Sequence, residues 1–167
     1  MESERNSTAA AADKVLTSLN LPLLVVTTAN SKTRAGCLVG FATQCSVDPL
    51  LLIVCISREN RTCRVADEAA GLAIHGISEA ERDLAELFGG ETGDEIDKFE
   101  HCEWRRGPLG LPLLARAPGW IAATIEGRMD AGDHIAHLVK PTSAELRRSF
   151  DPLRTRKGAE IEPGHDA

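Results

Sequence analysis

Short apolar runs separated by polar turns dominate the pattern of hydrophobic and polar positions along the chain. Several runs are rich in β-branched residues and have the length of a buried strand, most clearly the run LLLIVCIS after Pro49. Glycine, asparagine and serine mark the turns between them. The pattern predicts strands over residues 21–28, 37–43, 50–57, 72–77, 119–129 and 133–140, with a polar turn over 29–36.

Helical patterns are fewer. Residues 1–12 are polar and rich in Ala, and they predict a flexible arm or the start of a helix that ends near Asn20. A short helix is predicted over 61–70, stopped by Gly71. The clearest helix follows Ser78, which forms a capping box with Glu81. Its apolar stripe, ended by a glycine pair, is Ala80, Leu84, Leu87 and Phe88.

The remaining segments predict irregular structure. Residues 91–118 carry many Gly, Pro and acidic residues and should be mostly loop. After Pro141 the chain is basic and then acidic, without a periodic pattern. We therefore expect an N-terminal arm over 1–12, one β-rich domain over 13–141 and a C-terminal tail over 142–167.

Five or so strands with only short helices indicate a closed or split β-barrel rather than a parallel sheet. The 167 residues are the length of a single domain. Aromatic residues make up only 4% of the chain, with no Tyr, so the core should be aliphatic. So few rings also argue against a surface on which nucleic-acid bases stack.

Charge and hydropathy exclude further classes of partner. The net charge of -6 and the pI near 5.4 disfavour nucleic acid as the main ligand. No apolar run approaches the roughly 18 residues of a membrane-spanning helix. The first residues lack the pattern of a signal peptide, so we expect a cytoplasmic protein.

The cysteines and histidines predict no metal site. The five cysteines include no C-x-x-C pair, which fits neither a disulfide framework nor a zinc site. His75, His101, His137 and His165 have no ligand spacing, and the acidic run 91–97 lacks the alternation of a calcium loop. We expect surface positions for these residues, and a solvated tail for the basic run that begins at Arg147.

Familiar cofactor and nucleophile motifs are missing. The chain has no G-x-G-x-x-G, no phosphate-binding G-x-x-x-x-G-K-[ST] and no G-x-S-x-G. A cofactor, if one binds, must use another scheme.

Residues 34–62 carry the most informative order of features: a turn, a glycine, a strand, S-x-D-P, an apolar strand and R-x-N-x-T. This order resembles the flavin-reductase-like family. The similarity continues through Phe88-Gly89-Gly90, Lys98-Phe99 and Gly107 to Leu113, and it ends at Gly132-Asp133-His134. It covers about residues 14 to 140, most of the chain.

The resemblance implies an FMN-binding split barrel that forms a homodimer, with the flavin near the subunit interface. It assigns the FMN phosphate to the segment around residues 57–62, and it places His134 beside the flavin and the incoming nicotinamide. The chain departs from the family pattern in three places. Leu50 replaces the second proline of a P-P pair, apolar residues replace polar ones around Gly40, and a glycine is missing near His137.

The residues themselves point to the same two segments. In residues 38–43 the backbone can offer N–H and C=O groups to the edge of a flat ring, and Gly40 permits close approach. The alternative for this segment is a plain barrel strand with a bulge. The predicted cofactor-binding residues here are Leu38, Val39, Gly40, Phe41, Ala42 and Thr43.

The second segment lies between an apolar strand and a helix start. Asn60 is a plausible N-cap, and Arg58 and Arg61 add positive charge near free N–H groups, which favours an anion. Solvated arginines beside an ordinary cap are the alternative. The predicted cofactor-binding residues here are Ser57, Arg58, Asn60, Arg61 and Thr62.

His134 opens the last predicted strand and shares a face with Ala136 and Leu138, opposite His137 and Val139. A neutral imidazole here could hydrogen-bond a carboxamide and orient the nicotinamide ring. A structural or merely exposed turn histidine is the alternative.

The resulting prediction is an NAD(P)H-dependent flavin reductase that uses FMN, or FAD, and supplies reduced flavin to a partner such as a monooxygenase. His134 is the predicted catalytic residue, and no metal is predicted. Three alternatives stay open: a flavin or haem carrier without a nicotinamide site, a deazaflavin-dependent reductase, and a structural barrel without a ligand.

Overall fold

The computed structural model describes residues 2–164, with side chains from residue 7 onward. The helices are α1 Glu2–Leu19, α2 Arg61–Asp67, α3 Arg82–Gly90 and α4 Thr155–Gly158, with 3-10 turns η1 Glu79–Glu81, η2 Lys98–Glu100 and η3 Pro108–Gly110. The strands are β1 Leu24–Ala29, β2 Arg34–Val39, β3 Ala42–Ser46, β4 Leu51–Ser57, β5 Gly71–Gly76, β6 Trp104–Arg106, β7 Pro112–Leu114, β8 Gly119–Ala131 and β9 His134–Leu146.

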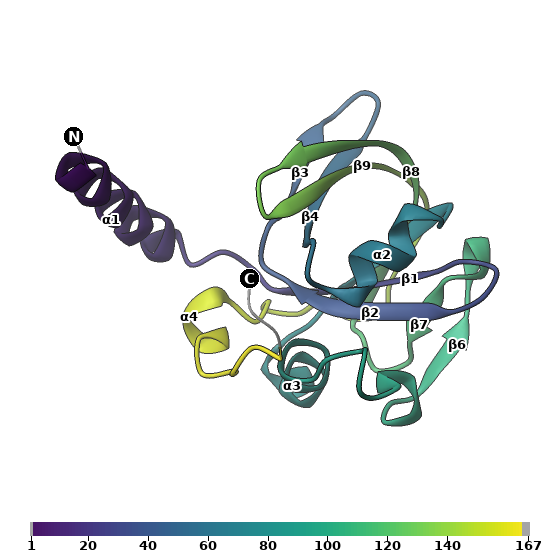
Figure 1. The fold of residues 1–167 in the computed structure, drawn as a ribbon. Helices are drawn as coiled ribbons and strands as arrows, with labels where there is room; N and C mark the ends of the chain where they lie inside the picture. The colour runs from purple at the N-terminus through teal and green to yellow at the C-terminus, as the bar shows by residue number, and fades with distance from the viewer. Residues whose placement is uncertain (1, 165–167) are drawn as a thin grey trace.

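Seven strands form one antiparallel sheet in the order β2-β1-β5-β8-β9-β4-β3. The sheet curls, so that β3, β4, β8 and β9 arch over β1 and β2 (Figure 1). Since β2 and β3 are both edge strands, the curl does not close by hydrogen bonds, and α2 lies across the opening against β2 and β4. The predicted mainly-β split barrel is confirmed.

The single strand predicted over residues 37–43 is wrong, because the chain crosses there from one sheet edge to the other. β2 pairs with β1, β3 pairs with β4, and Gly40 with Phe41 makes the bend between them. β2 also begins earlier than predicted. The Asn30 side chain accepts hydrogen bonds from the N–H groups of Lys32 and Thr33, both at 2.9 Å, which closes the turn by residue 33.

The two larger of three apolar clusters among the described residues lie inside and outside the barrel. One fills its interior, where Val26, Val54 and Leu72 are fully buried. The other lies outside, where α3 runs below β2 (Figure 1), and it includes the buried Phe88. A Cβ at Gly36 would lie 2.7 Å from the Phe88 ring, so the glycine permits this close approach. Truncation of a buried Phe to Ala typically costs about 3–5 kcal/mol, so we expect this contact to matter for folding.

The predicted capping box starts the turn η1 that leads into α3. Glu81 accepts hydrogen bonds from the Ser78 N–H at 3.0 Å and the Ser78 hydroxyl at 2.7 Å. Its second oxygen accepts from Arg148 at 2.5 Å. Burial opposes ionisation, but these hydrogen bonds hold the pKa of Glu81 below its usual value. One carboxylate thus caps the helical segment and ties it to the chain beyond β9.

Two segments predicted to be irregular contain ordered structure. β6 and β7 form a small hairpin within residues 91–118. β9 continues to Leu146 because its pairing with β8 extends to Gly119, well past the predicted end at residue 140. Beyond β9, Leu153 is buried and its backbone bonds Ile77 and Leu23, at 2.8 and 2.7 Å. The region after Pro141 is therefore tied to the fold, and backbone bonds continue this attachment as far as Gly164, whose N–H donates to the Gly89 carbonyl at 3.0 Å.

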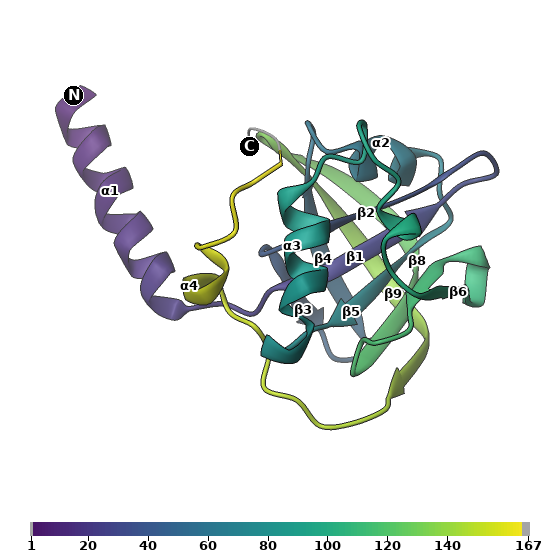
Figure 2. The same ribbon diagram turned by 90° about the horizontal axis from the view of Figure 1, so that it is seen from below.

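The helices α1 and α4 lie on one side of the barrel (Figures 1 and 2). α1 ends at Leu19, as predicted, and projects away from the barrel in both views (Figures 1 and 2). The segment after β9 runs along the lower edge of the view in Figure 2 to α4. Within the described residues, no helix is long and apolar enough to cross a membrane.

Candidate functional site

The ends of β4 and β9 bring several predicted site residues together in a hairpin corner, made of Phe41, Ser57, Arg58, Asp133 and His134. Ser57 pairs with His134 across the two strands, and the Cys55 N–H donates to the Phe41 carbonyl at 2.9 Å. The rings of Phe41 and His134 lie 5.2 Å apart, tilted by 57°. Residues predicted from separate motifs therefore meet at one place.

The imidazole of His134 is held on two sides. Its Nδ1 lies 2.7 Å from Asp133 Oδ1, and its side chain is only 16% exposed. The neighbouring imidazole lowers the pKa of Asp133, so this carboxylate is ionised at neutral pH and accepts from Nδ1–H. With the Phe41 ring on its other side, His134 has one ring nitrogen, Nε2, left for a ligand.

Arg58 faces the hairpin that carries His134. Its Nε donates to the Gly132 carbonyl at 2.8 Å, and its Nη2 lies 2.6 Å from Asp130 Oδ2. Its backbone N–H donates to the Asp133 carbonyl at 3.0 Å. The guanidinium of this residue, predicted to bind a cofactor, is directed at the β8–β9 turn.

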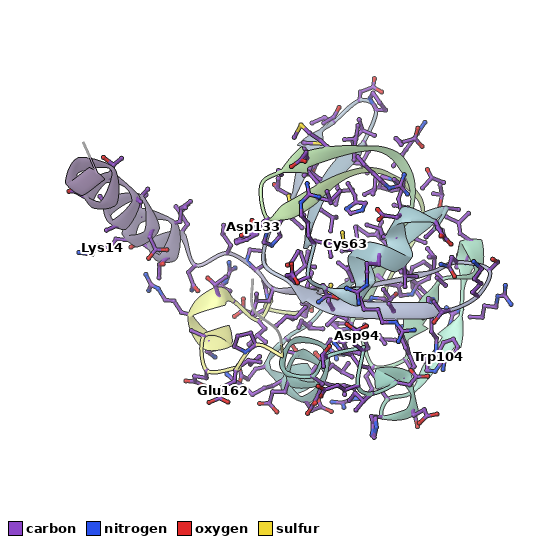
Figure 3. All side chains as sticks on the ribbon, viewed as in Figure 1. Lys14, Cys63, Asp94, Trp104, Asp133 and Glu162 are labelled. Atoms are coloured by element: carbon purple, nitrogen blue, oxygen red, sulfur yellow. The ribbon has the colours of Figure 1, made fainter. Side chains whose placement is uncertain are left out.

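Arg61 and Thr62 line a different site, a polar cleft of about 270 Å³ formed by residues 32–36, Arg61, Thr62 and residues 93–99. Asp94, which lines this cleft, and Asp133 of the hairpin corner lie on opposite sides of β2 in the view of Figure 3. Asn60 caps α2 by accepting from the Thr62 N–H at 2.9 Å, as predicted. Arg61 reaches across the cleft to the Gly93 carbonyl at 2.7 Å and the Thr33 hydroxyl at 3.0 Å.

Lys98 lies in the same cleft and is only 4% exposed. Its ammonium donates to the carbonyls of Phe88 at 2.9 Å and Gly36 at 3.3 Å. Burial lowers the pKa of Lys98 below 10.5. A buried cation held by neutral oxygens leaves its charge only partly compensated. The motifs did not predict Lys98 as a site residue, although it lies within the family resemblance. The feature that could have indicated it is a lysine between an acidic run and Phe99.

Two other arginines at the cleft are paired with carboxylates. Arg34 lies 2.7 Å from Asp97, and Arg64 lies 2.7 Å from Asp94. Within the described residues, the polar contacts of Arg61 and Lys98 are with neutral oxygens. The cleft therefore has an excess of positive charge in its interior.

The floor of the cleft contains a polar group without a partner. Thr62 is 1% exposed, and its hydroxyl makes no hydrogen bond of ordinary geometry among the described residues. Burial raises the pKa of the Cys37 thiol to about 11, and the neighbouring Thr62 hydroxyl lowers it by less. The thiol therefore stays neutral. Such a hydroxyl is available to donate to an anion in the cleft.

The rest of the segment 38–43 does not form one surface. Leu38 packs against α3 at Gly89, and Val39 is buried in the barrel interior. Ala42 and Thr43 line a separate, mainly apolar pocket of about 480 Å³ with Trp120 among its walls. The bend at Gly40 explains this division, because it turns the chain from β2 to β3. That these residues bind a cofactor stays a prediction.

The histidines and cysteines form no metal cluster among the described residues. His75 and His137 are fully buried, so the predicted surface positions are wrong for these two; both ring nitrogens of His75 are hydrogen-bonded, to Val25 O at 3.0 Å and Leu114 N at 3.1 Å. All five cysteines are unpaired. His165 lies outside the described residues.

Comparison with known proteins decides the family. The flavin reductase like domain matches residues 16–158. The chain belongs to this family. The stachydrine N-demethylase reductase subunit Stc3 of Rhizobium meliloti is 31% identical over 122 residues, which are 71% of this chain and 52% of the relative. The FMN reductase (NADH) RutF of Stutzerimonas stutzeri is 28% identical over 129 residues, 77% of this chain and 74% of the relative.

A solved structure agrees with the fold of this flavin-reductase-like chain. Component B of nitrilotriacetate monooxygenase from Mycobacterium thermoresistibile superposes with a TM-score of 0.76 at 20% identity, over 89% of this chain and 81% of the other. At this identity the likeness shows the fold. The chain spans between 39% and 52% of the length of the first curated relatives it matches.

Proposed function

We propose that this protein reduces flavin with NAD(P)H, with FMN as the bound flavin. The family supports the reaction class, and a relative is named FMN reductase (NADH). Bound flavin would supply the chemistry by accepting a hydride from nicotinamide C4 at its N5. The protein then needs to bind and orient two rings, with no nucleophile of its own.

The polar cleft fits the phosphate of FMN. Arg61 and Lys98 supply positive charge held by neutral oxygens, and the Thr62 hydroxyl is a buried donor without a partner. A phosphate would accept from all three and compensate the charge. This partly uncompensated positive charge, in one cleft with an unpartnered hydroxyl, is the observation that carries the proposal.

The hairpin corner is the proposed nicotinamide side. Asp133 fixes the His134 ring through Nδ1, and Phe41 is 59% exposed beside it. The free Nε2 of a neutral His134 would accept from the carboxamide N–H of the nicotinamide and orient its ring. The geometry required for hydride transfer is a ring separation of about 3–3.5 Å.

The experiment is to purify the protein, add FMN and follow NADH and NADPH oxidation by absorbance for the wild type and His134→Ala. We expect an active wild type and a loss of about tenfold or more in kcat/KM for the variant, within the range of a lost positioning contact. Equal rates would remove the role of His134. If the protein bound flavin but did not oxidise NADH or NADPH, it would be a flavin carrier and not a reductase.

We also propose a homodimer in the cytoplasm that delivers reduced flavin to an oxygenase. Relatives are named as reductase subunits of monooxygenases. A second copy would cover apolar side chains that one chain leaves exposed: Val15, Leu16 and Leu19 on α1, and Phe41, Leu50 and Leu146 on the barrel. Light scattering during gel filtration gives the mass, and a monomer would contradict the homodimer.

A further inference from the structure

Arg58 grips the β8–β9 turn by three contacts. The Nε bond to Gly132 and the Nη2 pair with Asp130 come from the guanidinium, and the backbone bond to Asp133 comes from the same residue. Asp130 is itself tied to the turn, since its Oδ1 accepts from the Gly132 N–H at 3.2 Å. Gly132 has a φ of 75°, which suits this tight turn.

The residues just after this turn are those that orient the proposed nicotinamide contact. The Asp133 carboxylate accepts a hydrogen bond from the His134 ring, and His134 lies against Phe41. Phe41 comes from the β2–β3 bend, a separate part of the chain. A shift of the turn would therefore move His134 relative to Phe41.

The two nearby arginines have divided tasks. Two of the three guanidinium nitrogens of Arg58 are used by the hairpin, whereas Arg61 reaches into the polar cleft. The hydrogen bond from the Arg58 guanidinium also lowers the pKa of Asp130, because it stabilises the ionised carboxylate. The pair is exposed, so its direct contribution to stability is small.

We propose that Arg58 is a positioning residue that holds the β8–β9 turn, and through it His134, in place against Phe41. Its effect on the reaction rests on the proposed role of His134. The fork of the guanidinium satisfies a carbonyl and a carboxylate at once, which a lysine ammonium matches poorly. Arg58 thus acts on the nicotinamide step and leaves phosphate binding to Arg61, Thr62 and Lys98.

The test compares Arg58→Met with Arg61→Met, with Arg116→Met as the matched control. Arg116 also bridges a carboxylate and a backbone carbonyl, those of Asp83 and Ala80, but on α3 and its leading turn. We expect Arg58→Met to lower kcat/KM for NADH by about tenfold or more while the Kd for FMN changes less than about twofold. Arg61→Met should raise the Kd for FMN, and Arg116→Met should change neither.

Two further measurements separate positioning from a merely structural effect. In a His134→Ala background, Arg58→Met should lower kcat/KM for NADH by less than about a further twofold, since both changes remove the same function. Arg58→Lys should recover part of the activity, because it keeps a charge for Asp130. Should Arg58→Met not fold, Asp130→Asn replaces it, because the Asp130 side chain is 77% exposed.

A ligand-free measurement keeps this proposal apart from the proposed function. The nuclear Overhauser contact between the Phe41 and His134 rings should be present in the wild type and in Arg116→Met, and lost in Arg58→Met. If wild-type protein reduces no flavin, the proposed function fails and this contact alone decides the positioning role. A retained contact, unchanged NADH kinetics, or a rise in the Kd for FMN equal to that of Arg61→Met would each overturn the proposal.

Discussion

The hairpin corner and the polar cleft are built from one short segment, residues 57–62, yet they differ in their physical character. In the corner, Ser57 and Arg58 bind the neighbouring hairpin, and an imidazole lies between a carboxylate and a phenyl ring. In the cleft, Arg61 and Thr62 face a buried lysine and neutral oxygens. Adjacent residues along a motif therefore serve two sites, because the chain turns from β4 into α2 between them.

Both regions need an intact fold. The largest effect that we expect is a loss of folding stability at low pH, caused by the buried His75. Burial, with a smaller contribution from Arg147, lowers the pKa of His75 to about 4 from 6.5. Between these values the unfolded chain binds a proton that the native protein does not. Stability is therefore complete above pH 6.5 and decreases as the pH falls toward 4, by about 3 kcal/mol.

Urea unfolding between pH 7.5 and pH 4 measures this decrease. His75→Gln should be less stable at neutral pH, since it disturbs bonds to Val25 and Leu114, and should lose much of the slope between pH 6.5 and 4. An unchanged slope in this variant would assign the pH dependence to other groups.

Loss of the buried cation should damage the cleft and spare the corner. Lys98→Met is expected to raise the Kd for FMN by about 10- to 100-fold, since a hydrogen bond to a charged group contributes about 1.5–3 kcal/mol. Titration calorimetry measures the Kd, and a thermal melt without FMN checks the fold. Lys32→Met, at the exposed rim of the same cleft, should change the Kd less than about threefold. Equal effects of the two changes would contradict a phosphate held in the interior.

Loss of the ring beside His134 should damage the corner and spare the cleft. Phe41→Ala removes the ring contact, which is worth about 0.5–1.5 kcal/mol, so we expect up to about a tenfold rise in KM for NADH. The Kd for FMN should stay within about twofold, because Phe41 is not a wall of the cleft. Val47→Ala, also exposed, serves as the control. A larger effect on FMN than on NADH would show that the two regions are not separate.

Added salt should have the smallest effect on flavin binding, and it should separate the contribution of the FMN phosphate from that of the flavin ring. Raising NaCl from low to about 0.5 M shortens the screening length and should weaken FMN binding a few-fold, while riboflavin, which lacks the phosphate, should respond less. Fluorescence titration measures both affinities. In Lys98→Met the difference between the two ligands should shrink, and an unchanged difference would place the phosphate elsewhere.

The sequence by itself determined the features that arise from neighbouring residues. Alternating apolar runs and turns specified most strands, the Ser78–Glu81 pair specified a capping box, and Asn60 specified the cap of α2. Each of these rests on contacts within a few residues, so the local pattern contains the needed information. The family resemblance, which the comparisons confirm, also follows from the order of such motifs.

Only the tertiary structure decided which of those motif residues act together. The bend at Gly40 splits a predicted strand and separates Leu38 and Val39 from Ala42 and Thr43. Lys98 joins the cleft by bonding Gly36, which lies 62 positions earlier in the chain, and Arg58 bonds Gly132, 74 positions later. The direction of a guanidinium and the burial of an ammonium depend on such distant partners, and a linear pattern of residue types does not encode them.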